Sequence, residues 1–325
     1  MKRLILFTLI VIFSLSLLTA CGQSAAPATP EESVTPRVGA LTGPTAMGML
    51  KLISDEGSDY DCTLFGSADE LPSRILNAEL DIAAVPMNLA ALFYNQTEGG
   101  VRLLAVNVLG VLYIGEYNSD ELDSLASLKG KTLYATGKGA APEYFLRYVL
   151  AENGIDMDSE LNVEWRSEPA ELVALLNAKQ SGIVMLPQPY ASAAEMQLGE
   201  GFHTALSLSD EWAALDNGSL CTTAGIIVRT EFAEAHPEVV EKFLRDYRDS
   251  AGWVNANTDE VAALCEELGI VKAAVAKIAL PKCNIVCITG SEMKSAAGGC
   301  LKVLYDCAPA SVGGALPGDD FYYGA

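Results

Sequence analysis

The chain has 325 residues, half of them hydrophobic, and a formal net charge of −21 at pH 7. A chain of this length exceeds the usual size of a single core, so we expect two domains that can each bury their apolar residues. Such an acidic excess repels phosphate backbones, which argues against nucleic acid as a partner.

The first residues predict a secretory signal peptide over 1–20. Two basic residues precede an uncharged run over 4–18, which is short for a membrane-spanning helix. The following Leu-Thr-Ala-Cys is similar to a bacterial lipobox, which implies lipidation of the Cys21 thiol. An ordinary signal peptide with an incidental cysteine is the alternative. Residues 21–36 have the composition of a flexible tether, so we expect a protein anchored by lipid at the extracytoplasmic face of a bacterial membrane.

The cysteines leave the question of disulfides open. Of eight cysteines, an odd number remains beside Cys21, so at least one thiol stays free even where disulfides are permitted. Four lie near the C-terminal end, at Cys283, Cys287, Cys300 and Cys307. Their spacing is not that of a zinc ribbon and no histidine is near, so we expect neither a metal nor another cofactor.

Short apolar runs alternate with helical periodicity along the rest of the chain. The runs expected as strands are RVGAL, CTLFG, LDIAAVP, VRLLAVNVLGVLYIGE, KTLYAT, NVEWR, SGIVMLP and TTAGIIVR. Helical periodicity covers 45–56, 69–78, 142–153, 169–178, 231–256 and 259–268. Several strand runs are apolar throughout, as buried parallel strands are, so the pattern predicts an α/β fold with a mostly parallel sheet.

One unit occurs twice in the sequence. Residues 64–86 and 164–187 both read as a strand, a serine, an acidic first turn, a helix and a second strand that ends in proline. A strand with a glycine turn precedes each copy, at 39–45 and 134–144. The repeat predicts two lobes, and ligands of open α/β sheets bind beyond the carboxyl ends of the strands. The apolar runs before and after the second copy would cross between the lobes and form a hinge.

Several motifs together resemble a known family. They are the lipobox and tether, GPTAMGM, AELDIAAVP, LASLKGKTLYATGKGAAPEYFLRYVLAENGI, IVMLPQPYASAA and VGGALPGDDFYY, and they cover nearly the whole chain after the signal. They resemble solute-binding lipoproteins of ABC importers, in the branch of nitrate, sulfonate, taurine and thiamine-precursor binders.

This resemblance implies a type II periplasmic-binding-protein fold, which is α/β with two lobes and a two-crossing hinge. It implies lobe I over 37–110 and 225–325, lobe II over 115–220, and hinges near 110–115 and 220–225. It also implies a monomer that delivers a small-molecule solute to a membrane permease and ATPase pair.

Catalytic motifs are absent from the sequence. The two histidines, His203 and His236, belong to no His-Glu-x-x-His motif, and the chain has no Gly-x-Ser-x-Gly elbow. Neither glycine turn has the spacing of a Walker loop or of a dinucleotide-binding turn. We therefore expect a protein that is not an enzyme. The alternative is a periplasmic-binding fold that has become an enzyme or a ligand sensor.

In the first copy, the turn after the first strand supplies binding chemistry. Gly43 permits a positive φ, Pro44 presets a helical φ, and Thr45 offers a hydroxyl beside free N–H groups, although an ordinary helix start is the alternative. Further candidates follow the next two strands, at Ser67, Met87 and Asn88. A helix cap is the alternative role for the serine, and core packing is the alternative for the methionine.

In the second copy, Gly137, Lys138 and Gly139 form the matching turn. The glycines let a ligand approach the backbone, and Lys138 either adds a positive charge to the site or is simply solvated. Gln188 lies between two prolines at the end of a strand, and its position in the repeat predicts that it lines the cleft. Tyr113 is a candidate aromatic wall, with core packing as its alternative.

Lys138 is the only basic residue among these candidates. Tight capture of a sulfonate or nitrate would therefore depend on N–H dipoles, Thr45 and Lys138, because no arginine clamp is visible. This pattern favours a neutral or amphipathic heterocycle over a simple oxyanion, and a sulfonate-like ligand is the alternative.

Overall fold

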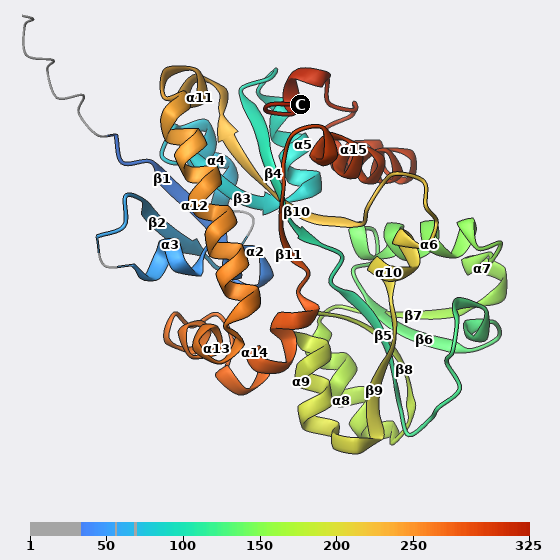
Figure 1. The fold of residues 1–325 in the computed structure, drawn as a ribbon. Coiled ribbons are helices and arrows are strands. Elements are labelled where there is room, and N and C mark those ends of the chain that lie inside the picture. Colours follow the sequence, from blue (N-terminus) through green and yellow to red (C-terminus); the bar gives the residue numbers. More distant parts are fainter. Residues whose placement is uncertain (1–33, 56, 68–69) are drawn as a thin grey trace, which may run out of the picture. The chain divides into compact units, whose positions relative to one another are not determined.

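The computed structural model describes residues 34–325 except 56, 68 and 69, so the predicted signal peptide, Cys21 and most of the tether lie outside the described residues. Two sheets organise the fold, one of six strands and one of five, called here sheet A and sheet B (Figure 1). Among the described residues, no helix combines the length and the apolar character that crossing a membrane requires.

Sheet A has the strand order β11-β4-β10-β3-β1-β2. Its strands are β1 Arg37–Leu41, β2 Asp61–Phe65, β3 Ile82–Pro86, β4 Val101–Leu109, β10 Thr222–Arg229 and β11 Ile285–Ile288. Strand β1 pairs in parallel with β2 and β3, whereas β10 runs antiparallel to both β3 and β4. The inner strands are apolar on both faces because helices cover both sides of the sheet.

Sheet B has the strand order β7-β6-β8-β5-β9. Its strands are β5 Leu112–Tyr117, β6 Thr132–Thr136, β7 Asn162–Arg166, β8 Gly182–Pro187 and β9 Phe202–Ser207. Strand β6 pairs in parallel with β7 and β8, whereas β5 runs antiparallel to β8 and β9. Sheet B therefore forms from one continuous part of the chain.

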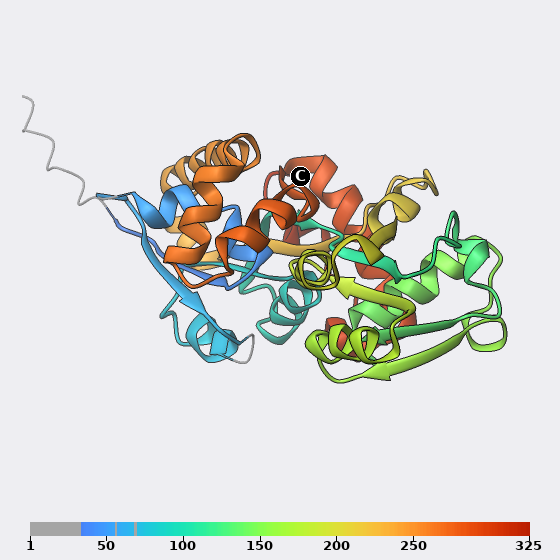
Figure 2. The same ribbon diagram turned by 90° about the horizontal axis from the view of Figure 1, so that it is seen from below.

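Helices cover both faces of sheet A, and α12 and α4 lie on opposite sides of it in Figure 2. The first face packs on α2 Pro44–Met47, α3 Leu50–Ser54, α11 Thr230–Ala235, α12 Pro237–Ala256, α13 Thr258–Glu267 and α14 Ala273–Ala279. The second face packs on α4 Leu71–Leu76, α5 Met87–Gln96 and α15 Gly290–Cys307. Helix α12 forms because Val240, Phe243, Leu244, Tyr247 and Val254 recur at helical spacing and are buried together.

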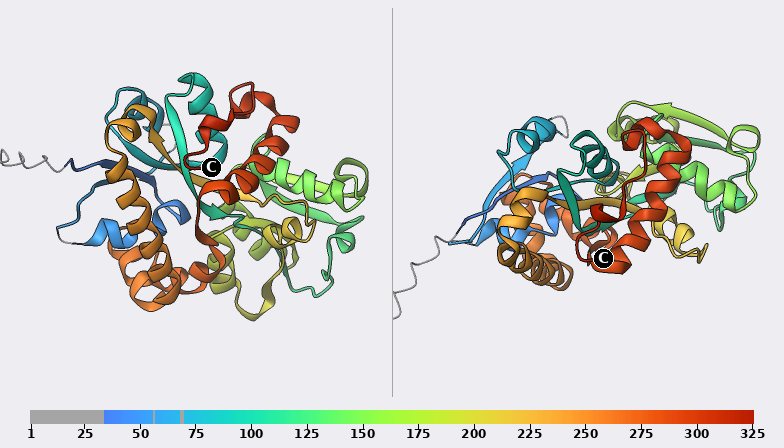
Figure 3. Two further views of the ribbon diagram at one scale, coloured as in Figure 1. Left: turned by 45° about the horizontal axis from the view of Figure 1, so that its top comes forward. Right: turned by 90° about the horizontal axis from the view of Figure 1, so that it is seen from above.

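Helices also cover both faces of sheet B. One face packs on α6 Ala141–Glu152, α7 Met157–Glu160 and α10 Leu208–Ala213, and the other on α8 Pro169–Lys179 and α9 Tyr190–Leu198. The short 3-10 helices are η2 Leu125–Leu128, η3 Gly199–Gly201, η4 Leu280–Lys282, η5 Pro309–Val312 and η6 Asp319–Phe321. Helix α15 contacts both β4 and α6, so one apolar core extends from sheet A into sheet B (Figure 3).

The predicted repeat is confirmed in the pairing of the strands. Val38 pairs with Ile82 in the first copy, and Leu133 pairs with Ile183 at the equivalent position of the second. Each copy is a parallel trio with an antiparallel neighbour beside its third strand. That neighbour is β10 in sheet A and β5 in sheet B. Each of these two strands is the first strand after the chain has crossed from one sheet to the other.

The run expected as a strand over 101–116 is two strands rather than one. Strand β4 ends at Leu109 in sheet A and β5 begins at Leu112 in sheet B. A side chain at the intervening Gly110 would come within 2.9 Å of Ser209 Cβ, so a small residue is needed where the chain changes sheets.

Two expected helices are also interrupted. The helix over 45–56 is two short helices, and at Gly48 between them a side chain would come within 2.5 Å of the Tyr247 hydroxyl. The helix over 231–256 breaks at His236, because the following Pro237 restricts the backbone before it and begins α12.

The described cysteines after the tether are all free thiols. Cys221, Cys265, Cys283 and Cys300 are buried in the core, and burial raises the pKa of Cys283 to about 12. A thiol in such surroundings stays protonated and unreactive, so the core cysteines act as small apolar side chains.

Candidate functional site

The carboxyl edges of the two sheets meet where the chain passes from β4 to β5. Strands β1, β3 and β4 all end at one edge of sheet A, and β6, β8 and β9 end at the matching edge of sheet B. Only Gly110 and Val111 separate the end of β4 from the start of β5. The loops that follow the parallel strands are therefore the natural place for a ligand.

The first glycine turn leaves polar groups open at this edge. Gly43 has φ 111° and begins α2, and its carbonyl accepts hydrogen bonds from the N–H groups of Ala46 and Met47. Pro44 is the first residue of α2, and no side chain caps the helix. The Thr45 carbonyl accepts from Asn107 Nδ2 at 3.2 Å, but no described residue pairs with the Thr45 hydroxyl.

The second glycine turn is largely satisfied by its own helix. Gly137 and Gly139 have φ 86° and 74°, and the Gly139 N–H donates to Glu143 Oε2 at 2.6 Å. A carboxylate already occupies the donor that an anionic ligand would need, so this turn is unfavourable for an anion. Lys138 is exposed and forms no ion pair with any described residue.

Gln188 is the predicted residue that the structure places most favourably. Its side chain is 3% exposed, and its backbone N–H donates to the Val111 carbonyl at 2.9 Å, which ties the end of β8 to the crossing. Its Oε1 accepts from the Ser192 hydroxyl at 2.8 Å, whereas its Nε2 has no partner among the described residues. The crossing thus carries a buried amide donor that is free to pair with a ligand.

Three residues that were not predicted from the sequence also carry a buried polar atom without a partner in the described part of the chain. Asn107 Oδ1, Thr222 Oγ1 and Ser311 Oγ are buried and lack partners among the described residues. Asn107 lies in β4, two residues before its end, and Thr222 of β10 pairs with Leu109. Asn107 had a sequence signal, because it is a lone polar residue in an apolar run, whereas Thr222 becomes relevant only through strand pairing.

Three further predicted residues are engaged with the protein itself. Met87 is 1% exposed and belongs to the core. Asn88 Nδ2 donates to the Ser311 carbonyl at 3.4 Å, which places Asn88 next to one of the unpartnered hydroxyls. Ser67 follows β2 at the outer edge of sheet A, and its N–H donates to Glu70 Oε1 at 3.2 Å.

Tyr113 of sheet B contacts the segment that precedes β11. Its hydroxyl donates to the Lys282 carbonyl at 2.8 Å, and burial raises the Tyr113 pKa to about 12. Lys282 Nζ in turn pairs with Glu195 Oε1 of α9 at 2.6 Å, and Asn284 Nδ2 donates to the Gly110 carbonyl at 2.6 Å. These contacts place the segment before β11 against both the crossing and sheet B.

Arginine contributes little positive charge here. Arg166 ends β7, but its guanidinium pairs with Glu164 Oε2 at 2.9 Å. The exposed Lys138 is therefore the unpaired cation among the predicted residues, and most of the buried chemistry at the edges is uncharged amide and hydroxyl.

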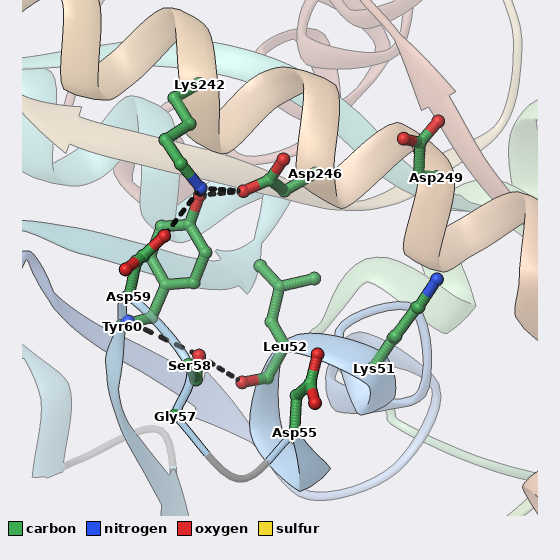
Figure 4. A pocket seen from close by; sticks show the side chains of 10 residues that line it. All are labelled: Lys51, Leu52, Asp55, Gly57, Ser58, Asp59, Tyr60, Lys242, Asp246 and Asp249. Atoms are coloured by element: carbon green, nitrogen blue, oxygen red, sulfur yellow. Dashed lines mark hydrogen bonds and ion pairs between the residues drawn. The ribbon is translucent and has the colours of Figure 1, made fainter.

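A separate pocket of about 250 Å³ lies between α3 and α12, on the first face of sheet A (Figure 4). Lys242 pairs with both Asp59 and Asp246, and the Tyr60 hydroxyl donates to Asp246. These polar groups already satisfy one another, unlike those at the strand ends. We therefore do not assign the ligand to this pocket.

Comparison with known proteins shows the family. Residues 45–269 match the model of the NMT1-like family, which is more than half of the chain, so the protein belongs to this family. No curated protein sequence matches the chain.

Solved structures show the same fold. An ABC transporter protein from Parabacteroides distasonis is 21% identical with a TM-score of 0.75, and the match covers 89% of this chain and 98% of that one. The periplasmic aliphatic sulphonate-binding protein of Escherichia coli is 16% identical with a TM-score of 0.66, covering 86% and 95%. A putative periplasmic sulfonate-binding protein from Methylobacillus flagellatus is 13% identical with a TM-score of 0.60, covering 85% and 86%. The fold is thus the two-lobed type II periplasmic-binding-protein fold, as the sequence predicted.

Proposed function

We propose that the protein is an extracytoplasmic solute-binding lipoprotein that captures a small molecule between its lobes for an ABC importer. The observation that carries this proposal is a set of buried, unpartnered side-chain atoms. Asn107 Oδ1, Gln188 Nε2 and Thr222 Oγ1 belong to residues near the strand ends at the facing edges, and Ser311 Oγ belongs to a residue that contacts Asn88 at the start of α5. Buried polar groups are normally paired, so this set is suited to a ligand that supplies the partners.

The lobes of this proposal follow the two sheets. Lobe I comprises 37–110 and 225–325, lobe II comprises 115–220, and the chain crosses between them near 110–115 and 220–225. Two crossings beside the binding edges permit rigid-body closure around a solute. The contacts of Tyr113 with Lys282 and of Lys282 with Glu195 join the two proposed lobes beside the first crossing.

The ligand of this proposal is small and pairs with both donors and acceptors. Asn107 Oδ1 accepts hydrogen bonds and Gln188 Nε2 donates them, and hydroxyls do both. A neutral or amphipathic heterocycle suits this mixture. A sulfonate-like solute is the second class, because sulfonate-binding proteins are among the matched structures and the Thr45 hydroxyl is open.

We base the proposed partners and cellular location of the protein on its family and on the predicted signal peptide with its lipobox. Lipidated Cys21 would hold the protein at the outer face of the cell membrane, and the tether over 21–36 would let it reach a permease and ATPase pair. The protein would act as a monomer without catalysis or cofactor, and its one membrane contact would be the lipid.

The first experiment identifies the solute. Ligand extracted from the purified protein is analysed by denaturing mass spectrometry, and thermal unfolding and titration calorimetry are run against taurine, alkylsulfonates, nitrate, pyrimidines and thiamine precursors. We expect one class to raise the melting temperature without turnover. Selective binding of sulfonates would reject the heterocycle assignment, and product formation would reject a purely binding role.

A pair of variants then tests the site. We expect Gln188→Ala to weaken binding of the identified solute at least tenfold, because the solute loses a buried hydrogen bond. Gln197→Ala is the matched control, since Gln197 is exposed on α9, and it should bind like the wild type. Equal affinity of all three proteins would place the ligand elsewhere.

A further inference from the structure

Three donor groups meet at the end of sheet B that lies away from the candidate ligand site. Glu116 is in β5 and His203 is in β9, and the two residues face each other directly in the antiparallel ladder. His203 Nε2 lies 3.5 Å from Glu116 Oε1 and 3.8 Å from Asp120 Oδ1. One donor atom from each of the three residues lies within 4.8 Å of the others.

Glu116 adds a second, independent observation. Its side chain is 0% exposed, yet its Oε2 has no hydrogen-bond partner among the described residues. Its Oε1 accepts from the N–H groups of Glu121 at 2.9 Å and Leu122 at 3.0 Å, which holds the carboxylate in place. A buried carboxylate with an unpartnered oxygen is destabilising unless a cation or another donor reaches it.

The separations of these atoms suit a divalent transition metal ion. Two ligands at about 2.1 Å from a tetrahedral zinc ion lie about 3.4 Å from each other. From His203 Nε2, the distances of 3.5 Å to Glu116 Oε1 and 3.8 Å to Asp120 Oδ1 are close to that value. The unpartnered Oε2 is the other oxygen of the same Glu116 carboxylate. One imidazole with two carboxylates is a donor set that zinc accepts.

The surroundings allow an ion to enter. The side chain of Asp120 is 99% exposed and that of His203 is 44% exposed. Both residues line a surface hollow that also includes Glu200 of η3. A metal bound here would face solvent, which leaves room for water at a fourth position.

We propose that Glu116, Asp120 and His203 bind a divalent transition metal ion, with zinc the best match to the donors. The ion would connect β5 and β9 and fix the loop that follows β5. The site is four residues along β5 from the crossing at Leu112, or about 13 Å. It is therefore separate from the candidate ligand site and does not rest on the proposed function.

The test is zinc binding to metal-free protein, measured by titration calorimetry and by the melting temperature. We expect one zinc ion per chain and a higher melting temperature in its presence. His203→Gln and Asp120→Asn should each weaken zinc binding at least tenfold. Asp120 is exposed, so this variant is informative even where a change at the buried Glu116 prevents folding.

The chain offers a matched control, because His236 is its other histidine. The His236 ring lies tilted against Phe232, with ring centroids 5.1 Å apart, and His236 is no member of the cluster, so His236→Gln should bind zinc like the wild type. Cobalt spectra, recorded in parallel, should lack a thiolate charge-transfer band, which separates this site from the free cysteines.

Two results would overturn the proposal. The first is an absence of stoichiometric zinc binding to the wild type, which would leave the contacts of His203 with the two carboxylates as purely structural. The second is equal zinc affinity of the wild type, His203→Gln and Asp120→Asn. Neither result bears on capture of a solute at the other end of sheet B.

Discussion

The two copies of the repeat share one topology but are held together differently where their parallel strands begin. In the first copy, Asp81 is 4% exposed and pairs with Arg37 at 2.7 Å and with Arg229 at 2.9 Å. By strand register, the equivalents of Arg37 and Asp81 in the second copy are Thr132 and Gly182, and Asn162 Nδ2 donates to the Thr132 hydroxyl at 3.1 Å.

The two copies reach the same topology with different polar contacts at this end of their strands. In sheet A, the ion pairs of Asp81 with Arg37 and Arg229 connect β1, β3 and β10. In sheet B, an uncharged hydrogen bond connects β6 and β7. What the copies share is the apolar third strand, Ile82–Pro86 in one and 183–187 in the other. Burial of this strand on both faces is therefore a stabilising feature that the two parallel trios have in common.

The largest expected effect on stability is at Asp81, the buried carboxylate that pairs with Arg37 and Arg229. We expect Asp81→Asn to lower the free energy of unfolding by about 3 kcal/mol, because two arginines lose their buried counter-ion. Urea unfolding followed by circular dichroism measures the change. Glu79→Gln is the control, since its ion pair with Arg74 is exposed, and it should cost less than about 1 kcal/mol. Equal effects would mean that the buried charge does not fasten sheet A.

Asp81→Asn should also change how the stability of the protein depends on pH. Burial raises the pKa of the Asp81 carboxyl, but hydrogen bonds from Arg37 and Arg229 outweigh this effect and bring the pKa below its ordinary value. The stabilisation is thus fully present above about pH 4 and is lost as the pH falls through the lowered pKa. Asp81→Asn should remove that part of the acid sensitivity of unfolding.

An intermediate effect is expected at the equivalent position of the second copy. Gly182 has φ 148°, and a Cβ there would lie 3.1 Å from Leu176 Cδ2. We expect Gly182→Ala to cost about 1–3 kcal/mol, because an L residue is strained in this conformation. Gly130→Ala separates strain from crowding, since Gly130 has φ 75° and a methyl group added there would meet no neighbouring atom within 4 Å. An unchanged free energy of unfolding in Gly182→Ala would show that the backbone at the start of β8 can relax to accept a side chain.

The smallest effect is expected at the uncharged contact. Asn162→Ala should cost about 1 kcal/mol or less, because Asn162 is exposed and one neutral hydrogen bond is lost. The same urea experiment measures it, with Asn162→Asp as a companion that keeps the size of the side chain. A loss as large as that of Asp81→Asn would contradict the contrast between the copies.

The sequence predicted the fold well because its signals are local. Apolar runs that end in proline located β3 and β8, and the repeated unit located the two trios. The glycine turns were also predictable from sequence, because a positive φ at Gly43 and Gly137 requires glycine.

The unpartnered groups were harder to predict because they depend on strand pairing. Thr222 lies beside the carboxyl end of β4 only because β10 pairs with β4, and Glu116 meets His203 only because β5 pairs with β9. No spacing in the sequence reports either encounter. A lone Asn107 within an apolar strand is the kind of signal that could have been used.

The insertion of β10 between β3 and β4 sets an order of folding as the chain is synthesised. Sheet B is complete once residue 207 is available, whereas β3 and β4 remain unjoined until residues 222–229 arrive. The final contact is later still, because Tyr322 forms a bridge to Leu103 and the Tyr323 N–H donates to the Leu103 carbonyl at 3.0 Å. Until β10 and β11 pair with it, β4 has two exposed edges that favour aggregation. The first strands made therefore belong to the sheet that is completed last.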